Sequence, residues 1–214
     1  MSLLIKAGIV TLTIGSVSTA GYFGGTYLFG RTPIKDLINK EYQYILLDTT
    51  GNNDSSYWDA NWKTYQDTNT SKDSDDLGLE GWIKGQKKDL KDKLKLKCKE
   101  LSGTSVYGNE NLTYKHVTKY CARYVNVKDQ AKKEGLTIID DSNAGESWNK
   151  REQNKSNLTN HFTNLGIRPS AGGDIKANDI KTGCGSIATK NKSENNYQTI
   201  YDSYKEVCVK KSND

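Results

Sequence analysis

Four cysteines are the residues of this 214-residue chain with the most evident chemistry. They could bind a metal, stay as buried thiols, or form two disulfide bonds in one of three pairings. Zinc sites usually contain a C-x2-C pair or histidines at ligand spacing, and the chain has neither. Its only histidines, His116 and His161, are 45 residues apart. Disulfides and buried thiols are therefore the two interpretations left for Cys98, Cys121, Cys184 and Cys208.

Acidic residues are the next candidates for chemistry. Pairs such as Asp75–Asp76 and Asp140–Asp141 act as acid and base only within a cleft, and their surroundings are typical of turns. A calcium-loop frame runs from Asn69 to Glu80, but Ser74 stands where that loop requires glycine. Walker loops, nucleophile elbows and HExxH motifs do not occur in the sequence. The sequence therefore predicts no catalytic residue, no metal ligand and no cofactor, although a hydrolase that uses scattered carboxylates remains an alternative.

Lysines are concentrated between residues 84 and 99. On a helix whose apolar side contains Leu90, Leu94 and Cys98, they would cover the outward face. Such a face is usually only solvated, but it could also contact a polyanion. The candidate contact residues are Lys84, Lys87, Lys88, Lys91 and Lys95. The run contains no arginine or aromatic residue that would stack on a base, so no specific nucleic-acid partner is expected.

Composition limits the size of the core and the choice of partners. Hydrophobic residues make up 34% of the chain, the mean hydropathy is -0.79, and the net charge of +5 is small for 57 charged residues, 31 basic and 26 acidic. Such a polar chain can bury only a thin core, which favours helices with narrow apolar stripes. Four Trp and thirteen Tyr place it outside the disordered class.

Residues 7–29 form a stretch of 23 residues without a charge. At about 1.5 Å per residue, a helix of this length spans a hydrocarbon core of about 30 Å. A cleavable signal peptide that ends at Ser18-Thr19-Ala20 is the alternative, but apolar residues continue to Phe29, which favours an uncleaved anchor. We therefore expect residues 1–30 to be a signal anchor in membrane lipid. The remainder would then lie outside the cell, where disulfides form.

An internal repeat selects among the cysteine pairings. Trp58 precedes Cys98 by 40 residues and Trp148 precedes Cys184 by 36 residues, and each tryptophan follows an apolar run that ends in Asp. The next cysteine comes 23 residues later in the first case and 24 in the second. We interpret this as two units, residues 40–128 and 135–211, with Trp58 and Trp148 as aromatic anchors of their cores. The repeat predicts the disulfides Cys98–Cys121 and Cys184–Cys208.

Helices must position these residues. An S-x-x-D signal at Ser56 predicts a helix that buries Trp58, Trp62 and Tyr65. Apolar spacing predicts further helices over residues 79–101 and about 112–128. Residues 42–47 and 136–139 could be short strands, and residues 49–55, 66–76 and 141–146 are expected to be loops. The predicted fold class is mainly α: an N-terminal transmembrane helix, then two duplicated helical units with one disulfide each.

The N-terminal M-S-L-L-I-K-A-G stretch and the repeated positions resemble the short uncharacterised paralogous proteins of haemotropic mycoplasmas. The positions that carry the resemblance are Leu46, Leu47, Asp48, Trp58, Cys98, Cys121, Trp148, Cys184 and Cys208. The resemblance implies a protein displayed on the surface of a wall-less bacterium, in antigenic variation or in contact with host cells. Its expected partners are membrane lipid through residues 7–29 and a host surface or an antibody. No oligomeric state is predicted.

Overall fold

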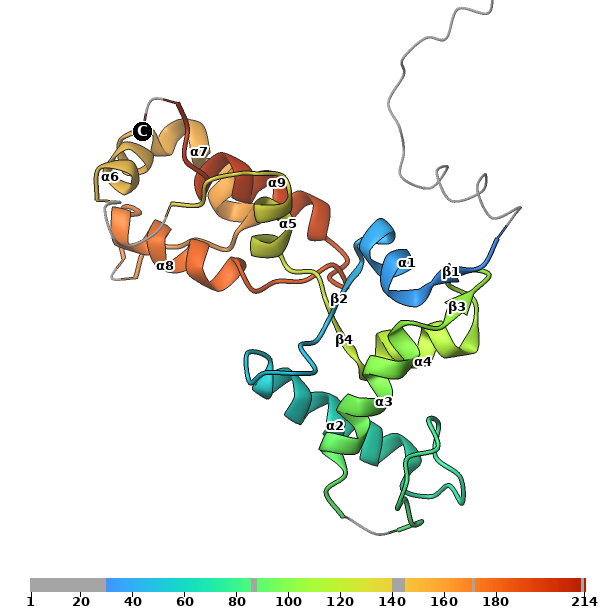
Figure 1. Cartoon of the computed structure of the whole chain (residues 1–214). Helices are drawn as coiled ribbons and strands as arrows, with labels where there is room; N and C mark the ends of the chain where they lie inside the picture. The colour runs from blue at the N-terminus through green and yellow to red at the C-terminus, as the bar shows by residue number, and fades with distance from the viewer. Residues whose placement is uncertain (1–29, 86–87, 140–144, 171, 213) are drawn as a thin grey trace, which may run out of the picture.

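The computed structural model describes residues 30–85, 88–139, 145–170, 172–212 and 214. These residues form nine helices and four short strands, which confirms the mainly helical fold class. Two bodies are visible in Figure 1, one coloured blue to green and the other yellow to red. Each has its own core of buried side chains, drawn from residues 34–121 in the first body and 127–209 in the second.

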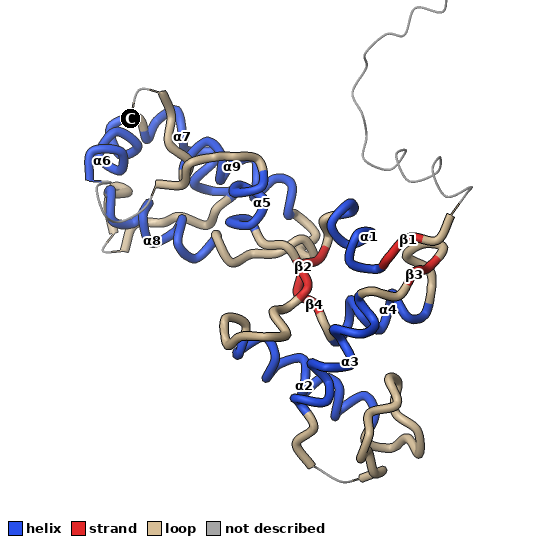
Figure 2. Tube along the Cα trace, in the orientation of Figure 1, coloured by secondary structure: helices blue, strands red, loops and turns tan. Residues whose placement is uncertain are grey.

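Among the described residues, the first body consists of four helices and two small antiparallel strand pairs. Its elements are β1 (Thr32–Pro33), α1 (Ile34–Glu41), β2 (Tyr44–Leu46), α2 (Ser55–Asn69), α3 (Lys91–Ser102), β3 (Ser105–Val106), α4 (Leu112–Tyr120) and β4 (Ala122–Tyr124). Strand β1 pairs with β3, and β2 pairs with β4. Figure 2 places the β2–β4 pair where the two bodies meet, and β4 leads into the second body.

The second body contains only helices and isolated bridges among the described residues. Its elements are α5 (Val127–Lys133), α6 (Gly145–Gln153), α7 (Lys155–Asn164), α8 (Ala177–Ile187) and α9 (Tyr197–Val207). Single bridges join Asn126 to Asn191 and Ile138 to Val209. Because Val127 and Ala131 belong to the second core, this body begins earlier than the expected boundary at residue 135.

Helix α2 forms as its aromatic spacing predicts. Trp58 and Tyr65 are fully buried and Trp62 is 7% exposed, since side chains at i, i+4 and i+7 share one face. The helix begins one residue before Ser56 and continues to Asn69, so the predicted loop over 66–76 is helical in its first four residues.

The predicted helix over residues 79–101 is wrong for its first half. Gly81 and Gly85 have φ angles of +85° and +74°, which interrupt a right-handed helix. Helix α3 begins only at Lys91. Leu79 and Leu90 are buried, as a helical stripe would require, but they reach the core from a loop, whereas Ile83 is 53% exposed.

The predicted helix over residues 112–128 is also wrong in its second half. Helix α4 ends at Tyr120, and the chain then continues as β4 beside β2. The Cys121 carbonyl accepts a hydrogen bond from the Leu47 N–H (3.0 Å), so long-range pairing replaces further helix. Tyr44–Leu46 does form a strand, one of the two alternatives for residues 42–47.

Among the described residues, no helix has both the length and the apolar character needed to cross a membrane. The predicted anchor, residues 7–29, lies outside the described part of the chain.

Two glycines of α8 should respond in opposite ways to the same substitution. A Cβ atom at Gly183 would collide with the side chain of Ile167, which is buried, whereas a Cβ at Gly185 would have no atom within 4 Å. We expect Gly183→Ala to lower the free energy of unfolding by about 1–3 kcal/mol through overpacking. Gly185→Ala should raise it by up to about 1 kcal/mol through helix propensity. Urea unfolding of both variants checks this, and equal shifts would contradict the packing of Ile167 on α8.

Candidate functional site

Two disulfide bonds, Cys98–Cys121 and Cys184–Cys208, are present, which confirms the predicted pairing. Each connects a helix, α3 or α8, to the residue that directly follows the last helix of its body, α4 or α9. The Cα atoms are 5.4 and 5.7 Å apart, and all four cysteines are at most 4% exposed. Because every sulfur is bonded, the zinc and free-thiol interpretations do not hold.

In both bodies, the first turn of the first helix is hydrogen-bonded to the segment that follows the helix with the first cysteine. The Ile34 N–H donates to the Thr104 carbonyl (3.0 Å), and the Val127 N–H donates to the Lys190 carbonyl (2.8 Å). Thr104 and Lys190 both lie six residues after the first cysteine of their body. The first turns of α1 and α5 therefore have equivalent attachments.

The second cysteines also have equivalent backbone partners. The Leu47 N–H donates to the Cys121 carbonyl, and the Ile139 N–H donates to the Cys208 carbonyl, both at 3.0 Å. Leu47 and Ile139 are the residues that precede the repeated Asp. The apolar run, the last helix and the disulfide are thus connected identically in the two bodies.

The two tryptophan anchors lie in the cores, Trp58 fully buried and Trp148 5% exposed. Their indole N–H groups differ. That of Trp58 donates to the Asp48 carbonyl (2.8 Å), and the Lys95 ammonium lies 5.8 Å from its ring centroid. The Trp148 indole N–H has no acceptor among the described residues.

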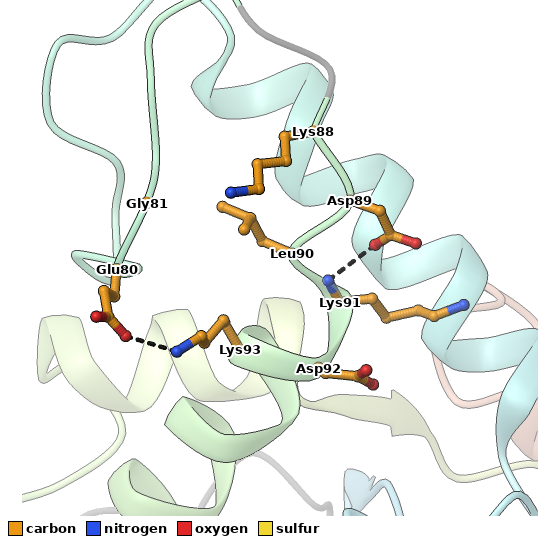
Figure 3. Close-up of a pocket in the computed structure, with 8 residues that line it drawn as sticks. All are labelled: Glu80, Gly81, Lys88, Asp89, Leu90, Lys91, Asp92 and Lys93. Atoms are coloured by element: carbon orange, nitrogen blue, oxygen red, sulfur yellow. Dashed lines mark hydrogen bonds and ion pairs between the residues drawn. The ribbon is translucent and has the colours of Figure 1, made fainter.

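The candidate polyanion contacts do not form one helix face. Lys84 and Lys88 lie in the loop before α3, only Lys91 and Lys95 belong to the helix, and Lys87 lies outside the described residues. Figure 3 shows the region around Lys88, where a shallow hollow is lined by the loop and the first turn of α3.

Four lysines in α3 and the loop before it, two of them candidate contacts, pair with carboxylates. The ion pairs are Lys84–Asp73 (3.0 Å), Lys91–Asp59 (2.6 Å), Lys93–Glu80 (2.5 Å) and Lys97–Glu100 (3.1 Å). In Figure 3, Lys93 extends toward Glu80, and this hydrogen bond holds the pKa of Glu80 below its usual range. The hydrogen bond from Lys91 to Asp59 raises the pKa of Lys91. Acidic groups therefore offset much of the positive charge of this surface. The polyanion contact stays a prediction.

The carboxylate of Asp75, at the centre of the calcium-loop frame, accepts hydrogen bonds from buried groups of the protein. Asp75 is 9% exposed and accepts the Tyr65 hydroxyl and the backbone N–H groups of Leu77 and Leu79, the latter two at 3.0 Å. These bonds fold the loop after α2 over the core. In the described part of the chain, no group of three or more His, Cys, Asp or Glu could hold a metal ion.

One histidine meets a serine that is distant in sequence. The His161 Nδ1 lies 3.3 Å from the Ser203 Oγ, which also accepts a hydrogen bond from the Asn164 amide (3.0 Å). Ser203 is only 1% exposed, so a substrate could not reach its oxygen. This contact joins α7 to α9, and sequence spacing alone gave no signal for it.

The fold and these contacts define a class of protein: a helical chain with two cores, each closed by a buried disulfide. No protein-family model, curated protein or solved structure matches the chain.

Proposed function

We propose that this chain is a membrane-anchored, surface-exposed protein that displays or binds with its outer domain and does not catalyse a reaction. The observation that carries the proposal is the pair of buried disulfides at equivalent positions. Disulfides persist in oxidising compartments and are rare in the bacterial cytosol. Residues 7–29 would supply the anchor, and the residues after them would lie outside the cell.

The two bodies are copies of one unit in this proposal. The repeated order of Trp and Cys supports this duplication. So do the matching hydrogen bonds, in which Ile34 donates to Thr104 as Val127 does to Lys190, and Leu47 donates to Cys121 as Ile139 does to Cys208. A duplicated unit that carries its own disulfide does not depend on a large core, which suits a chain of this polarity.

The surface role follows the resemblance to paralogous proteins of haemotropic mycoplasmas. On that basis the outer domain is a variable antigen or a host-contact module, with a host surface or an antibody as its partner. The use of acidic side chains as structural acceptors supports a non-catalytic role. Asp48, for example, accepts the backbone N–H groups of Thr50 and Gly51 at 2.8 and 3.1 Å, which also lowers its pKa.

Surface protease treatment of intact cells tests the location. We expect protease to release peptides from residues 31–214, and non-reducing peptide mapping to recover Cys98 linked to Cys121 and Cys184 linked to Cys208, because both pairs form outside the cytosol. A cytosolic protein provides the control for cell integrity. Protection of the chain until lysis, with all four thiols free to react with an alkylating reagent, would contradict the proposal.

A further inference from the structure

The second body contains a hollow of about 750 Å³. It lies between α5, α6 and α8, and its lining includes residues of the segment after α5 and one residue of α9. Cavities of about 300–1,000 Å³ are the usual size of small-molecule sites. The volume of the hollow is therefore sufficient for a small molecule. The residues that line it determine which chemical class of molecule could bind.

The interior of the hollow is largely apolar. Leu136, Ile138 and Ile139 approach it from the segment after α5, and Trp148 approaches it from α6. Ile139 and Trp148 are each 5% exposed and belong to the core of the second body. An alkyl chain placed here would lose contact with water on several sides, which favours binding.

Two aromatic side chains form part of this wall, Trp148 and Tyr204. The indole N–H of Trp148 is buried and has no acceptor among the described residues. Tyr204 is 1% exposed, and burial raises the pKa of its hydroxyl to about 12, so the group stays protonated at neutral pH. These two side chains therefore give the hollow aromatic surface without a negative charge.

Positive charge surrounds the opening. Lys128 and Lys132 lie one turn apart on α5, both are exposed, and neither pairs with a carboxylate of the described residues. Lys181 of α8 lines the same hollow. The described lining contains no Asp or Glu. Lys128 and Lys132 differ in this from Lys84, Lys91, Lys93 and Lys97, which pair with carboxylates.

The first body has larger or different residues at the equivalent positions. The residue after the first cysteine is Lys99 there and Gly185 here, and the residue four before the second cysteine is Val117 there and Tyr204 here. A Cβ atom at Gly185 would meet only open space. The open space beside Gly185 and the hydroxyl of Tyr204 are therefore specific to the second body.

We propose that the hollow binds an amphipathic anion with a single alkyl chain, its chain against Leu136, Ile138 and Trp148 and its head group at Lys128 and Lys132. A fatty-acid carboxylate and a lysophospholipid phosphate share this chemistry. The inference goes beyond the surface role and does not depend on it, because the purified, oxidised chain suffices for the test.

Calorimetric titration with laurate, below its micelle concentration, tests the proposal. We expect saturable binding at one site per chain. Gly185→Leu fills the hollow and should weaken binding about tenfold or more, a loss of about 1.4 kcal/mol. The matched control is Ser186→Leu, because Ser186 is exposed, adjacent in α8 and absent from the lining. Circular dichroism verifies that both variants are folded.

The same calorimetric titration tests the contribution of the two lysines and the identity of the ligand's head group. Lys128→Glu with Lys132→Glu should weaken laurate binding about tenfold, whereas Lys35→Glu should not, since Lys35 occupies the equivalent of position 128 in α1. A monoacyl lysophosphatidic acid of the same chain length distinguishes a phosphate head from a carboxylate, and tighter binding of either one identifies the source. The absence of saturable binding of both probes, or unchanged affinity in Gly185→Leu, would overturn the proposal.

Discussion

Replacement of both Cys98 and Cys121 by alanine is expected to destabilise the first body selectively. Each disulfide closes a loop between cysteines 23 or 24 residues apart, and a crosslink of that length contributes about 3 kcal/mol by restricting the unfolded chain. A domain of this size has a total stability of only about 5–15 kcal/mol. Because the two cores share no buried residue, the loss should stay in the body that carries the change.

Guanidinium unfolding followed by fluorescence and by peptide-resolved hydrogen exchange separates the two bodies. Trp58, Trp62 and Trp82 lie in the first body and Trp148 in the second, so fluorescence reports mainly on the first. The reciprocal variant, with Cys184 and Cys208 replaced, is the matched control and should lower protection only beyond residue 127. Simultaneous loss of protection in both bodies in each variant would contradict independent cores.

The correct predictions depended on residue spacings that hold for any backbone conformation between the spaced residues. The disulfide pairing followed from the repeated order of Trp and Cys, and the buried face of α2 followed from Trp58, Trp62 and Tyr65. These patterns are local, or are repeated twice in the chain. They needed no knowledge of which segments meet in space.

The predicted helices over residues 79–101 and 112–128 were partly wrong for a physical reason. Leu79 and Leu90 are buried, and the helical period cannot distinguish buried residues of a loop from those of a helix. Gly81 and Gly85 were the signal that could have corrected it, since glycine with positive φ ends a helix. The strand after Cys121 depends on its partner β2, about 80 residues earlier, and no local pattern encodes that pairing.

The hollow was missed for a related reason. Lys128, Trp148, Gly185 and Tyr204 come from four helices, and no two of them form a motif. Only the comparison with the first body makes them stand out, because Gly185 and Tyr204 replace Lys99 and Val117 at matched distances from the cysteines. An alignment of the two halves could have indicated the difference, but not the cavity.

Arg151 is expected to be the most sensitive charged residue of the second body. Its side chain is 7% exposed and donates two hydrogen bonds to Asp214, both at 2.7 Å. It also donates to the Val207 carbonyl (3.1 Å) and to the Val209 carbonyl (2.9 Å), on either side of Cys208. Arg151→Met would leave the buried Asp214 carboxylate with only the Lys211 N–H (2.7 Å) among these donors. It would also leave the two carbonyls without a donor, at a total cost of about 3–5 kcal/mol. Denaturant unfolding measures the loss. As a control, Lys63→Met in the exposed Lys63–Asp67 pair should change stability by at most about 1 kcal/mol.

The contact between Arg151 and Asp214 should also make the stability of the protein depend on pH in the acid range. The hydrogen bonds from Arg151 hold the pKa of Asp214 below its usual range. A carboxyl group with a lowered native pKa stabilises the fold above its unfolded pKa of about 4, and this stability is lost as the pH falls through the native value. Asp214→Asn keeps an acceptor but cannot titrate, so its stability should fall less steeply below pH 4 than that of the unmodified chain. Parallel pH dependence of the two proteins would show that the charge of Asp214 contributes nothing, and the stabilisation would then come from the two carbonyl bonds that fix the backbone on either side of Cys208.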